Sequence, residues 1–290
     1  MGALVTASWL AERLQRGAAV AVDATMPPVG VSPPVDTRAR YVAEHIPGAV
    51  FFDIDELSDQ RTALPHMLPD AETFSRAMSR LGVGDAMTIV VYEQEGVYSA
   101  PRAWWMLRSF DARAVYLLDG GLRAWKDAGL PTESGEVRRG AAKFSARLDA
   151  SAVRDFEDVQ AMIGRGGQIR EQIREQVVDA RSAGRFRGTA PEPRAGIASG
   201  HVPGAISVPF GELVEDGRMM GAARLREMFR ARGVRVEEPV TTMCGSGVTA
   251  AVVLLGLELA GAKKVSLYDG SWAEYAQRPE AAIERDEAQA

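Results

Sequence analysis

The sequence predicts an α/β protein built from two tandem copies of one domain, each a mostly parallel sheet flanked by helices. Two observations lead to this prediction. Short apolar segments alternate with helix-like segments along the chain, and the second half repeats motifs of the first half in the same order. The length of 290 residues is sufficient for two domains of ordinary size, each with its own hydrophobic core.

Three pairs of motifs reveal the repeat. AVDATMPP (21–28) resembles VVDARSAG (177–184), EHIPGAV (44–50) resembles GHVPGAI (200–206), and YLLDGGLRAW (116–125) resembles SLYDGSWAEY (266–275). The spacing is also repeated, because 24 positions separate Asp23 from Pro47 and 24 separate Asp179 from Pro203. We therefore expect an N-terminal domain over residues 1–131, a polar linker over residues 132–157 and a C-terminal domain over residues 158–290.

Each copy predicts the same order of elements. A β-branched strand ends in Asp, and a loop leads to His-[Ile/Val]-Pro-Gly and a second short strand. A helix, an apolar strand, a second helix, another strand and a last helix complete the copy. This alternation is typical of a parallel sheet, although it does not give the strand order. The paired strands are expected at 19–24 and 176–180, 49–54 and 205–210, 87–93 and 239–244, and 114–121 and 264–271, and the first paired helices at 71–82 and 222–233.

Composition excludes several classes of function. The formal charge of −5 and the pI of about 5.4 give no electrostatic footprint for nucleic acid. The longest apolar run, residues 250–257, is too short to cross a membrane, and residues 1–17 read as an amphipathic helix rather than a signal peptide. One cysteine and three dispersed histidines predict neither a disulfide framework nor a zinc site. We expect a cytoplasmic protein without metal or organic cofactor.

The single cysteine lies in a glycine-rich loop, TMCGSGVTA. When the copies are aligned through Gly96 and Gly247, VVYEQEGVYSA matches TTMCGSGVTAA without a gap, and Cys244 falls opposite Glu93. The first copy therefore lacks the nucleophile that the second copy has.

The residues around Cys244 predict an activated thiol. Glycines at 245 and 247 let successive backbone N–H groups point inward, and a helix expected to begin near Val248 adds its N-terminus. Such surroundings favour the thiolate, which is the nucleophile. A buried structural cysteine is the alternative. A cysteine-dependent phosphatase needs arginine six residues after the cysteine, where this chain has Ala250. Sulfur transfer through a persulfide then fits the loop, with Gly245, Gly247, Val248 and Thr249 binding the substrate sulfur.

Taken together, these motifs show a resemblance to a known family. Two copies, the blocks PEPR, SAPRAWW and GHVPGA, and the loop CGSGVTA resemble the rhodanese superfamily, in particular its two-domain 3-mercaptopyruvate sulfurtransferase branch. The resemblance covers roughly residues 5–279. It implies tandem rhodanese-like domains and an enzyme that moves sulfur from 3-mercaptopyruvate to a thiophilic acceptor such as thioredoxin or a small thiol, releasing pyruvate.

The resemblance also implies roles for residues outside the loop. Arg185, in AGRF, and Arg194, in PEPR, match substrate-binding arginines, and an arginine fork fits a carboxylate. Asp55 and His66 match a proposed relay with Ser246 as its third member. His66 also lies in a stretch that is five residues longer than its counterpart in the second copy, so it is an addition that could reach Cys244. His45 and His201 occupy equivalent positions and are expected to be structural.

Two other functions remain open at this stage. Thiosulfate:cyanide sulfurtransferases share the nucleophile, but their branch of the family carries cationic residues inside the loop, where this chain has Gly245 and Ser246. A noncatalytic protein that binds or senses persulfide is the alternative from another class. Such a sensor would take up one sulfur per chain and stop.

Overall fold

The computed structural model describes residues 2–31, 33, 35–163 and 175–286. Contacts divide the chain into two compact units, and the division differs from the two halves of the sequence. The first unit contains Met1–Arg61, Leu68–Asp149 and Val214–Met219, and the second contains Thr62–Met67, Ala150–Leu213 and Met220–Ala290. Each unit thus includes a short segment from the opposite half, and the two segments follow the equivalent Glu-Leu pairs of the copies.

The first unit contains a five-stranded parallel sheet. Its strand order is β1-β5-β4-β2-β3, and every neighbouring pair is parallel. A separate antiparallel hairpin, β9 (Val214–Glu215) with β10 (Arg218–Met219), belongs to the same unit. The other elements are β1 Leu4–Val5, α1 Ala7–Gln15, β2 Val20–Asp23, α2 Thr37–Ala43, β3 Val50–Phe51, α3 Ala71–Arg80, β4 Thr88–Tyr92, α4 Ala100–Ser109, β5 Ala114–Leu118 and α5 Gly121–Asp127.

The second unit repeats this topology. Its sheet has the order β6-β12-β11-β7-β8, again with only parallel neighbours, so each strand has a counterpart at the same place in the first sheet. The elements are η1 Ala150–Ala152, β6 Val153–Arg154, α6 Phe156–Ile163, β7 Gln176–Asp179, α7 Ala183–Arg187, β8 Ile206–Ser207, η2 Phe210–Leu213, α8 Ala222–Ala231, β11 Val240–Met243, α9 Ala250–Leu259, β12 Val265–Tyr268 and α10 Ser271–Tyr275. The predicted fold class, two α/β copies with parallel sheets, is confirmed.

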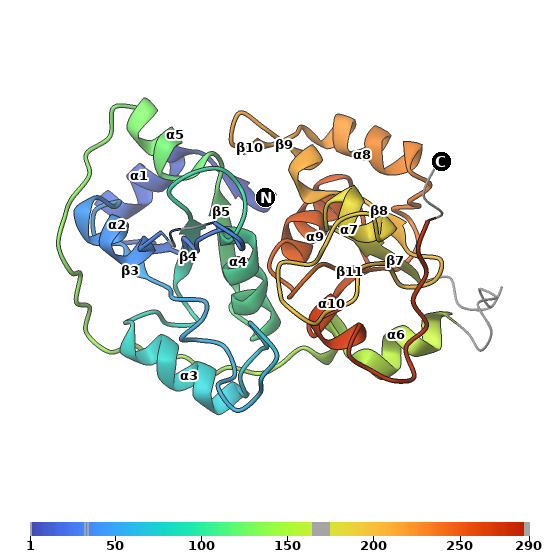
Figure 1. Cartoon of the computed structure of the whole chain (residues 1–290). Coiled ribbons are helices and arrows are strands. Elements are labelled where there is room, and N and C mark those ends of the chain that lie inside the picture. Colours follow the sequence, from blue (N-terminus) through green and yellow to red (C-terminus); the bar gives the residue numbers. More distant parts are fainter. Residues whose placement is uncertain (1, 32, 34, 164–174, 287–290) are drawn as a thin grey trace. The chain divides into compact units, whose positions relative to one another are not determined.

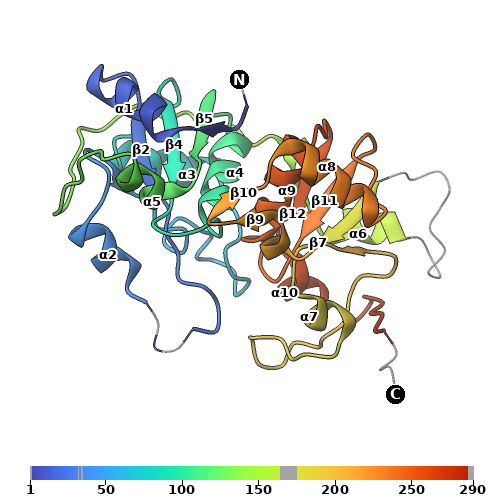
Figure 2. The same ribbon diagram turned by 90° about the horizontal axis from the view of Figure 1, so that it is seen from above.

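Helices cover both faces of each sheet (Figures 1 and 2). Strands β2, β7 and β11 are buried along their whole length, as expected for parallel strands covered on both faces. In the second unit, α6 and α10 pack on one face through Val159, Trp272 and Tyr275, and α8 and α9 contact each other as a separate layer. Helix α9 is apolar all round because nearly every one of its residues is buried.

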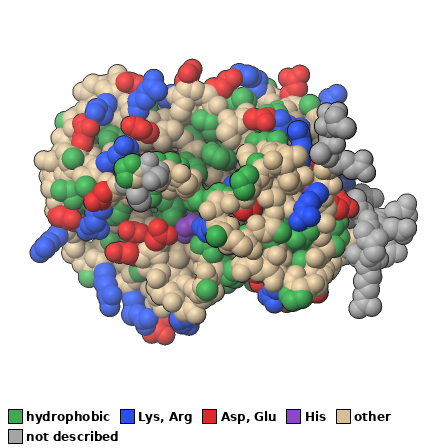
Figure 3. Space-filling model, viewed as in Figure 1, with side chains coloured by type: hydrophobic (Ala, Val, Ile, Leu, Met, Phe, Trp, Pro, Cys, Tyr) green, Lys and Arg blue, Asp and Glu red, His purple; other side chains and the backbone are tan. Residues whose placement is uncertain are grey.

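Three observations refine the predictions. The second sheet begins at β6, inside the range expected for the linker, and α6 begins near the end of that range. Residues 132–149 belong to the first unit, where Phe144 packs against Phe74. Helix α9 begins at Ala250, two residues later than expected. No helix among the described residues has the length and apolar character needed to cross a membrane. On the face drawn in Figure 3, acidic and basic side chains are interspersed.

Candidate active site

Cys244 directly follows β11, a central strand of the second sheet. Residues at the carboxyl ends of parallel strands commonly form ligand sites, and this is where the loop 244–249 lies. The thiol is free and the residue is only 2% exposed. Gly247 has φ +81°, a left-handed conformation that favours glycine and lets the loop turn back toward α9.

Helix α10 binds two backbone carbonyls of the loop. The backbone N–H of Trp272 donates to the carbonyl of Cys244 and that of Ala273 to the carbonyl of Gly245, both at 2.9 Å. The N–H of Ser246 points at the Cys244 Sγ, 3.5 Å away. The N–H groups of residues 247–250 have no hydrogen-bond acceptor within the described residues. They form a cradle of donors suited to an anionic sulfur.

Arg185, on α7, lies against this loop. A Cβ built on Gly245 would stand 2.8 Å from Arg185 Nη2, so the guanidinium occupies the space that any larger residue at 245 would need. Arg185 is held by Glu192, whose Oε2 accepts from Nε at 3.1 Å and from Nη2 at 2.5 Å. Its side chain is 22% exposed and therefore remains accessible to a ligand.

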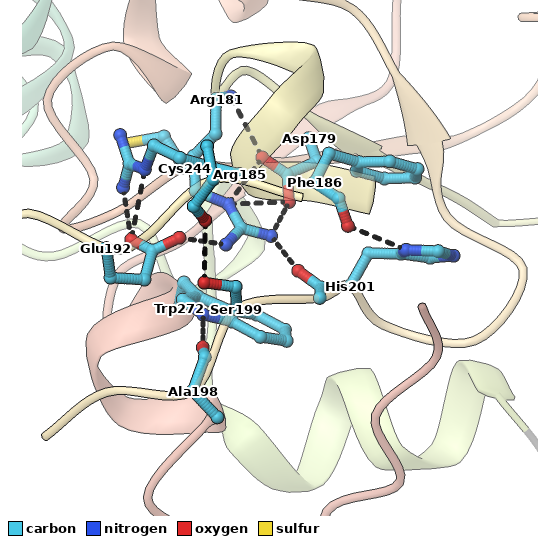
Figure 4. A network of polar contacts seen from close by, with 12 residues as sticks. Asp179, Arg181, Arg185, Phe186, Glu192, Ala198, Ser199, His201, Cys244 and Trp272 are labelled. Carbon is cyan, nitrogen blue, oxygen red and sulfur yellow. Dashed lines mark hydrogen bonds and ion pairs between the residues drawn. The ribbon is translucent and has the colours of Figure 1, made fainter. Parts of the chain in front are cut away.

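A buried ion-pair network stands behind Arg185 (Figure 4). Arg181 donates to Glu192 Oε1 at 2.8 Å, to Asp179 Oδ2 at 2.6 Å and to the carbonyl of Gly200 at 2.7 Å. Its guanidinium also lies 4.1 Å from the centre of the Trp272 ring. The Arg181 side chain is fully buried in this network.

His66 contacts the loop within the second unit, which includes Thr62–Met67. Its Nδ1 lies 2.9 Å from the Ser246 Oγ, and both residues are buried. The backbone of His66 has φ +61°, a left-handed conformation that is uncommon outside glycine. The insertion that carries His66 therefore reaches the cysteine loop through Ser246.

Comparison with known proteins identifies the architecture. The family described as Rhodanese-like domain matches residues 6–128 and again residues 155–278. The chain belongs to the rhodanese family. It is 44% identical to human 3-mercaptopyruvate sulfurtransferase over 285 residues, covering 95% of this chain and 92% of that protein. It is 42% identical to 3-mercaptopyruvate sulfurtransferase of Escherichia coli (strain K12), covering 97% of each.

Solved rhodanese-fold structures agree. The crystal structure of SseA from Escherichia coli has a TM-score of 0.83 and 39% sequence identity, covering 94% of this chain and all of that chain. The Tum1 protein from Saccharomyces cerevisiae has a TM-score of 0.86 and 30% identity, with 98% of each chain covered. The predicted superfamily is therefore confirmed for both copies.

The roles of two other residues, Arg194 and Asp55, stay predictions. Arg194 is half-buried in the loop between α7 and β8 and has no ion pair or hydrogen bond within the described residues. Asp55 is exposed in the first unit, where its backbone N–H donates to the Asp53 carboxylate at 3.0 Å. Its part in a relay with His66 stays a prediction.

Two further residues, for which the sequence predicted no role, support the loop 244–249. Glu192 positions Arg185, as described above. Ser271 is fully buried; its Oγ accepts from the backbone N–H of Cys244 at 3.2 Å and donates to the Tyr268 carbonyl at 2.8 Å. The signal for Ser271 was present in the repeat, because the aligned motifs read YLLDGG in the first copy and SLYDGS in the second.

The first copy fills the equivalent loop with a carboxylate. Glu93 is 3% exposed, and its Oε1 accepts from the N–H groups of Tyr98 at 2.8 Å and Ala100 at 3.2 Å. Its Oε2 accepts from the N–H of Ser99 at 3.1 Å and from the Ser99 hydroxyl at 3.2 Å. Burial raises the pKa of Glu93 above its ordinary value, and these four hydrogen bonds oppose the rise. The first rhodanese-like domain thus carries a side chain where the second has an open cradle.

The paired histidines are structural, as predicted. His45 Nδ1 lies 2.7 Å from the Tyr41 carbonyl, and His201 Nδ1 lies 2.9 Å from the Phe186 carbonyl. Each imidazole also stacks on the aromatic ring of that same residue. Among the described residues, no group of three or more His, Cys, Asp or Glu side chains could hold a metal ion.

Proposed function

We propose that the chain is a sulfurtransferase that takes sulfur from 3-mercaptopyruvate onto Cys244 and passes it to a thiophilic acceptor. One observation carries the proposal: the buried thiol of Cys244 lies in a loop whose N–H groups at 247–250 have no acceptor in the part of the chain that the structure describes, with the Arg185 guanidinium against Gly245. The human and Escherichia coli relatives named 3-mercaptopyruvate sulfurtransferase support the same donor.

In the first step the Cys244 thiolate attacks the sulfur of 3-mercaptopyruvate. A sulfur–sulfur bond forms and the carbon–sulfur bond of the substrate breaks, so the electron pair leaves with pyruvate enolate. The Cys244 side chain becomes a persulfide. The N–H groups of residues 247–250 stabilise the negative charge on its outer sulfur, with Gly245, Gly247, Val248 and Thr249 shaping the cradle.

The carboxylate and the enolate carbon of the substrate have separate partners in this proposal. Arg185, together with Arg194, binds the carboxylate and the adjacent keto oxygen. The enolate carbon must gain a proton to become pyruvate. Ser246 delivers it, and the contact of 2.9 Å between its hydroxyl and His66 Nδ1 supplies a route for replacement protons. Asp55 is the proposed third member of this relay.

In the second step an acceptor thiolate attacks the outer sulfur of the persulfide, and the Cys244 thiolate is regenerated. Thioredoxin and small thiols are the proposed acceptors, and cyanide serves in an assay. No metal or organic cofactor takes part in this scheme. We place the activity in the cytoplasm, where a single thiol stays reduced.

Thiosulfate is the second candidate donor. The chain is 39% identical to a protein of Gallus gallus named thiosulfate sulfurtransferase, over 95% of this chain and 94% of that protein. The loop itself favours the first candidate, because Gly245 and Ser246 add no positive charge for a dianion.

The test compares kcat/KM for 3-mercaptopyruvate and thiosulfate, with cyanide as the common acceptor, in the wild type and in Cys244→Ser. We expect a clear preference for 3-mercaptopyruvate and complete loss of turnover in the serine variant. A preference for thiosulfate would replace the donor and keep the nucleophile. Turnover in Cys244→Ser would refute the nucleophile, and a single sulfur taken up per chain would indicate a persulfide sensor.

A further inference from the structure

Four charged side chains form a chain of alternating sign that ends at the cysteine loop (Figure 4). Asp179 pairs with Arg181 at 2.6 Å, Arg181 with Glu192 at 2.8 Å, and Glu192 with Arg185 at 2.5 Å. The side chains of Asp179 and Arg181 are fully buried and that of Glu192 is 4% exposed. Two carboxylates and two guanidinium groups give this network a net charge of zero.

The network exists only in the copy that has the cysteine. Asp23 is the counterpart of Asp179, but Thr25 stands in the first copy where Arg181 stands in the second. There the Asp23 carboxylate accepts from the backbone N–H and the hydroxyl of Thr25 and from Gln94. A structural need of the fold would appear in both copies, so the ion pairs of the second copy point to a role at Cys244.

Glu192 is the member of the network that acts on the substrate site. One carboxylate oxygen is fixed by Arg181 and the other fixes Arg185, whose Nη2 lies against Gly245. The same contact offsets the positive charge of Arg185. Without Glu192 the guanidinium would present one more unit of positive charge to any anion beside Cys244.

We propose that Glu192 is a specificity-determining residue: it holds Arg185 against the cysteine loop and offsets its charge, so that the site favours sulfur donors with one negative charge over donors with two. 3-Mercaptopyruvate carries one charge on its carboxylate, whereas thiosulfate is a dianion. This inference rests on the proposed sulfurtransferase function.

The size of the effect follows from the charge removed. A unit charge within about 10 Å of a partly buried anion, at an effective dielectric constant of about 20, changes its binding by roughly ten-fold or more. Solvent access to Arg185 screens part of this. We therefore expect Glu192→Gln to raise kcat/KM for thiosulfate relative to 3-mercaptopyruvate by about ten-fold, mainly through KM. Glu192→Asp keeps the charge and should leave the ratio of the two donors near that of the wild type.

A second measurement needs no turnover. Cys244 is the only cysteine, so alkylation reports on this thiol alone. The ratio of its alkylation rates with anionic iodoacetate and neutral iodoacetamide reports the electrostatic potential at the Cys244 thiol. A purely structural change would alter both rates together. We expect this ratio to rise several-fold in Glu192→Gln and to fall in Arg185→Gln, which removes the opposite charge.

Glu237→Gln is the matched control. Glu237 also pairs with an arginine, Arg226, at 2.7 Å, but it precedes the amino end of β11 while Cys244 follows the carboxyl end. The substitution makes the same change in net charge and should leave the alkylation ratio unchanged. An unchanged ratio in Glu192→Gln, an equal rise in Glu237→Gln, or no fall in Arg185→Gln would each overturn the inference. A ratio that shifts as expected in a protein that turns over neither donor would support the charge effect and refute the proposed function instead.

Discussion

The first prediction concerns the buried Glu93 carboxylate, whose hydrogen bonds stabilise the loop of the first copy. Glu93→Ala removes the acceptor of four hydrogen bonds, three from backbone N–H groups and one from the Ser99 hydroxyl. Each such bond contributes about 1 kcal/mol net. Water that enters the vacated space restores a part, so we expect the free energy of unfolding of the first unit to fall by about 2–4 kcal/mol. With a urea m-value of about 2 kcal/mol/M, the midpoint should fall by about 1–2 M.

Tryptophan fluorescence follows this unit in urea. Trp9, Trp104, Trp105 and Trp125 belong to the first unit and only Trp272 to the second. Acetate adds a diagnostic step, because its carboxylate can occupy the empty position and accept the same N–H groups. We expect acetate to raise the midpoint of Glu93→Ala, with no comparable effect on the wild type.

Glu95→Ala is the matched control, since Glu95 is an exposed carboxylate in the same loop. It should unfold like the wild type with or without acetate. A midpoint of Glu93→Ala within about 0.3 M of the wild type would mean that the four hydrogen bonds contribute little net stability. Destabilisation without rescue by acetate would mean that the loop needs the glutamate side chain rather than an anion.

Three further predictions concern the loop and its counterpart. Gly245→Ala places a Cβ 2.8 Å from Arg185 Nη2, so we expect KM for 3-mercaptopyruvate to rise about ten-fold while kcat changes less, measured by steady-state kinetics. His66→Asn and Ser246→Ala should each lower kcat by about 100-fold. The double variant should have a kcat little lower than either single variant, because both substitutions interrupt the same proton route. Additive losses of kcat would show that the two residues act separately. Burial raises the pKa of Asp23 above 3.8, so its contribution to the free energy of unfolding is present below pH 3.8 and lost as pH rises through the folded-state pKa. The stability difference between wild type and Asp23→Asn should therefore fall with rising pH in urea titrations, and a constant difference would contradict the assignment.

Much of the fold could be predicted because its signals are local. The central strands are continuous apolar runs ending in Asp23 and Asp179, and the repeat shows that both copies follow one plan. The strand order could not be predicted, since periodicity identifies strands without identifying their neighbours. The edge strands β1 and β6 have two residues each, too few to give an alternating pattern. For that reason the second sheet begins inside a segment that reads as a linker.

In the site, too, some residues are recognisable from the sequence, whereas the roles of others depend on the fold. The cysteine, the loop glycines and Arg185 are recognisable from residue type and motif. Glu192 lies in the block PEPR, but its role could not be recognised there, because it depends on folding the chain from residue 181 to residue 192 so that one carboxylate meets two guanidinium groups. Such a contact leaves no mark in composition or periodicity.

The equivalent loops of the two copies share their backbone turn and differ in what their N–H groups bind. Gly96 and Gly247 have nearly the same left-handed φ, +78° and +81°, so both loops turn in the same way. In the first copy the N–H groups of Tyr98, Ser99 and Ala100 donate to the carboxylate of Glu93. In the second copy Cys244 replaces that carboxylate, its Sγ meets one N–H at 3.5 Å, and the N–H groups of 247–250 have no acceptor among the described residues. In the proposed mechanism these N–H groups are the donors available to the outer sulfur of a persulfide. The same loop geometry thus holds a carboxylate in the first copy and a thiol in the second, where the proposed mechanism needs donors for a sulfur anion.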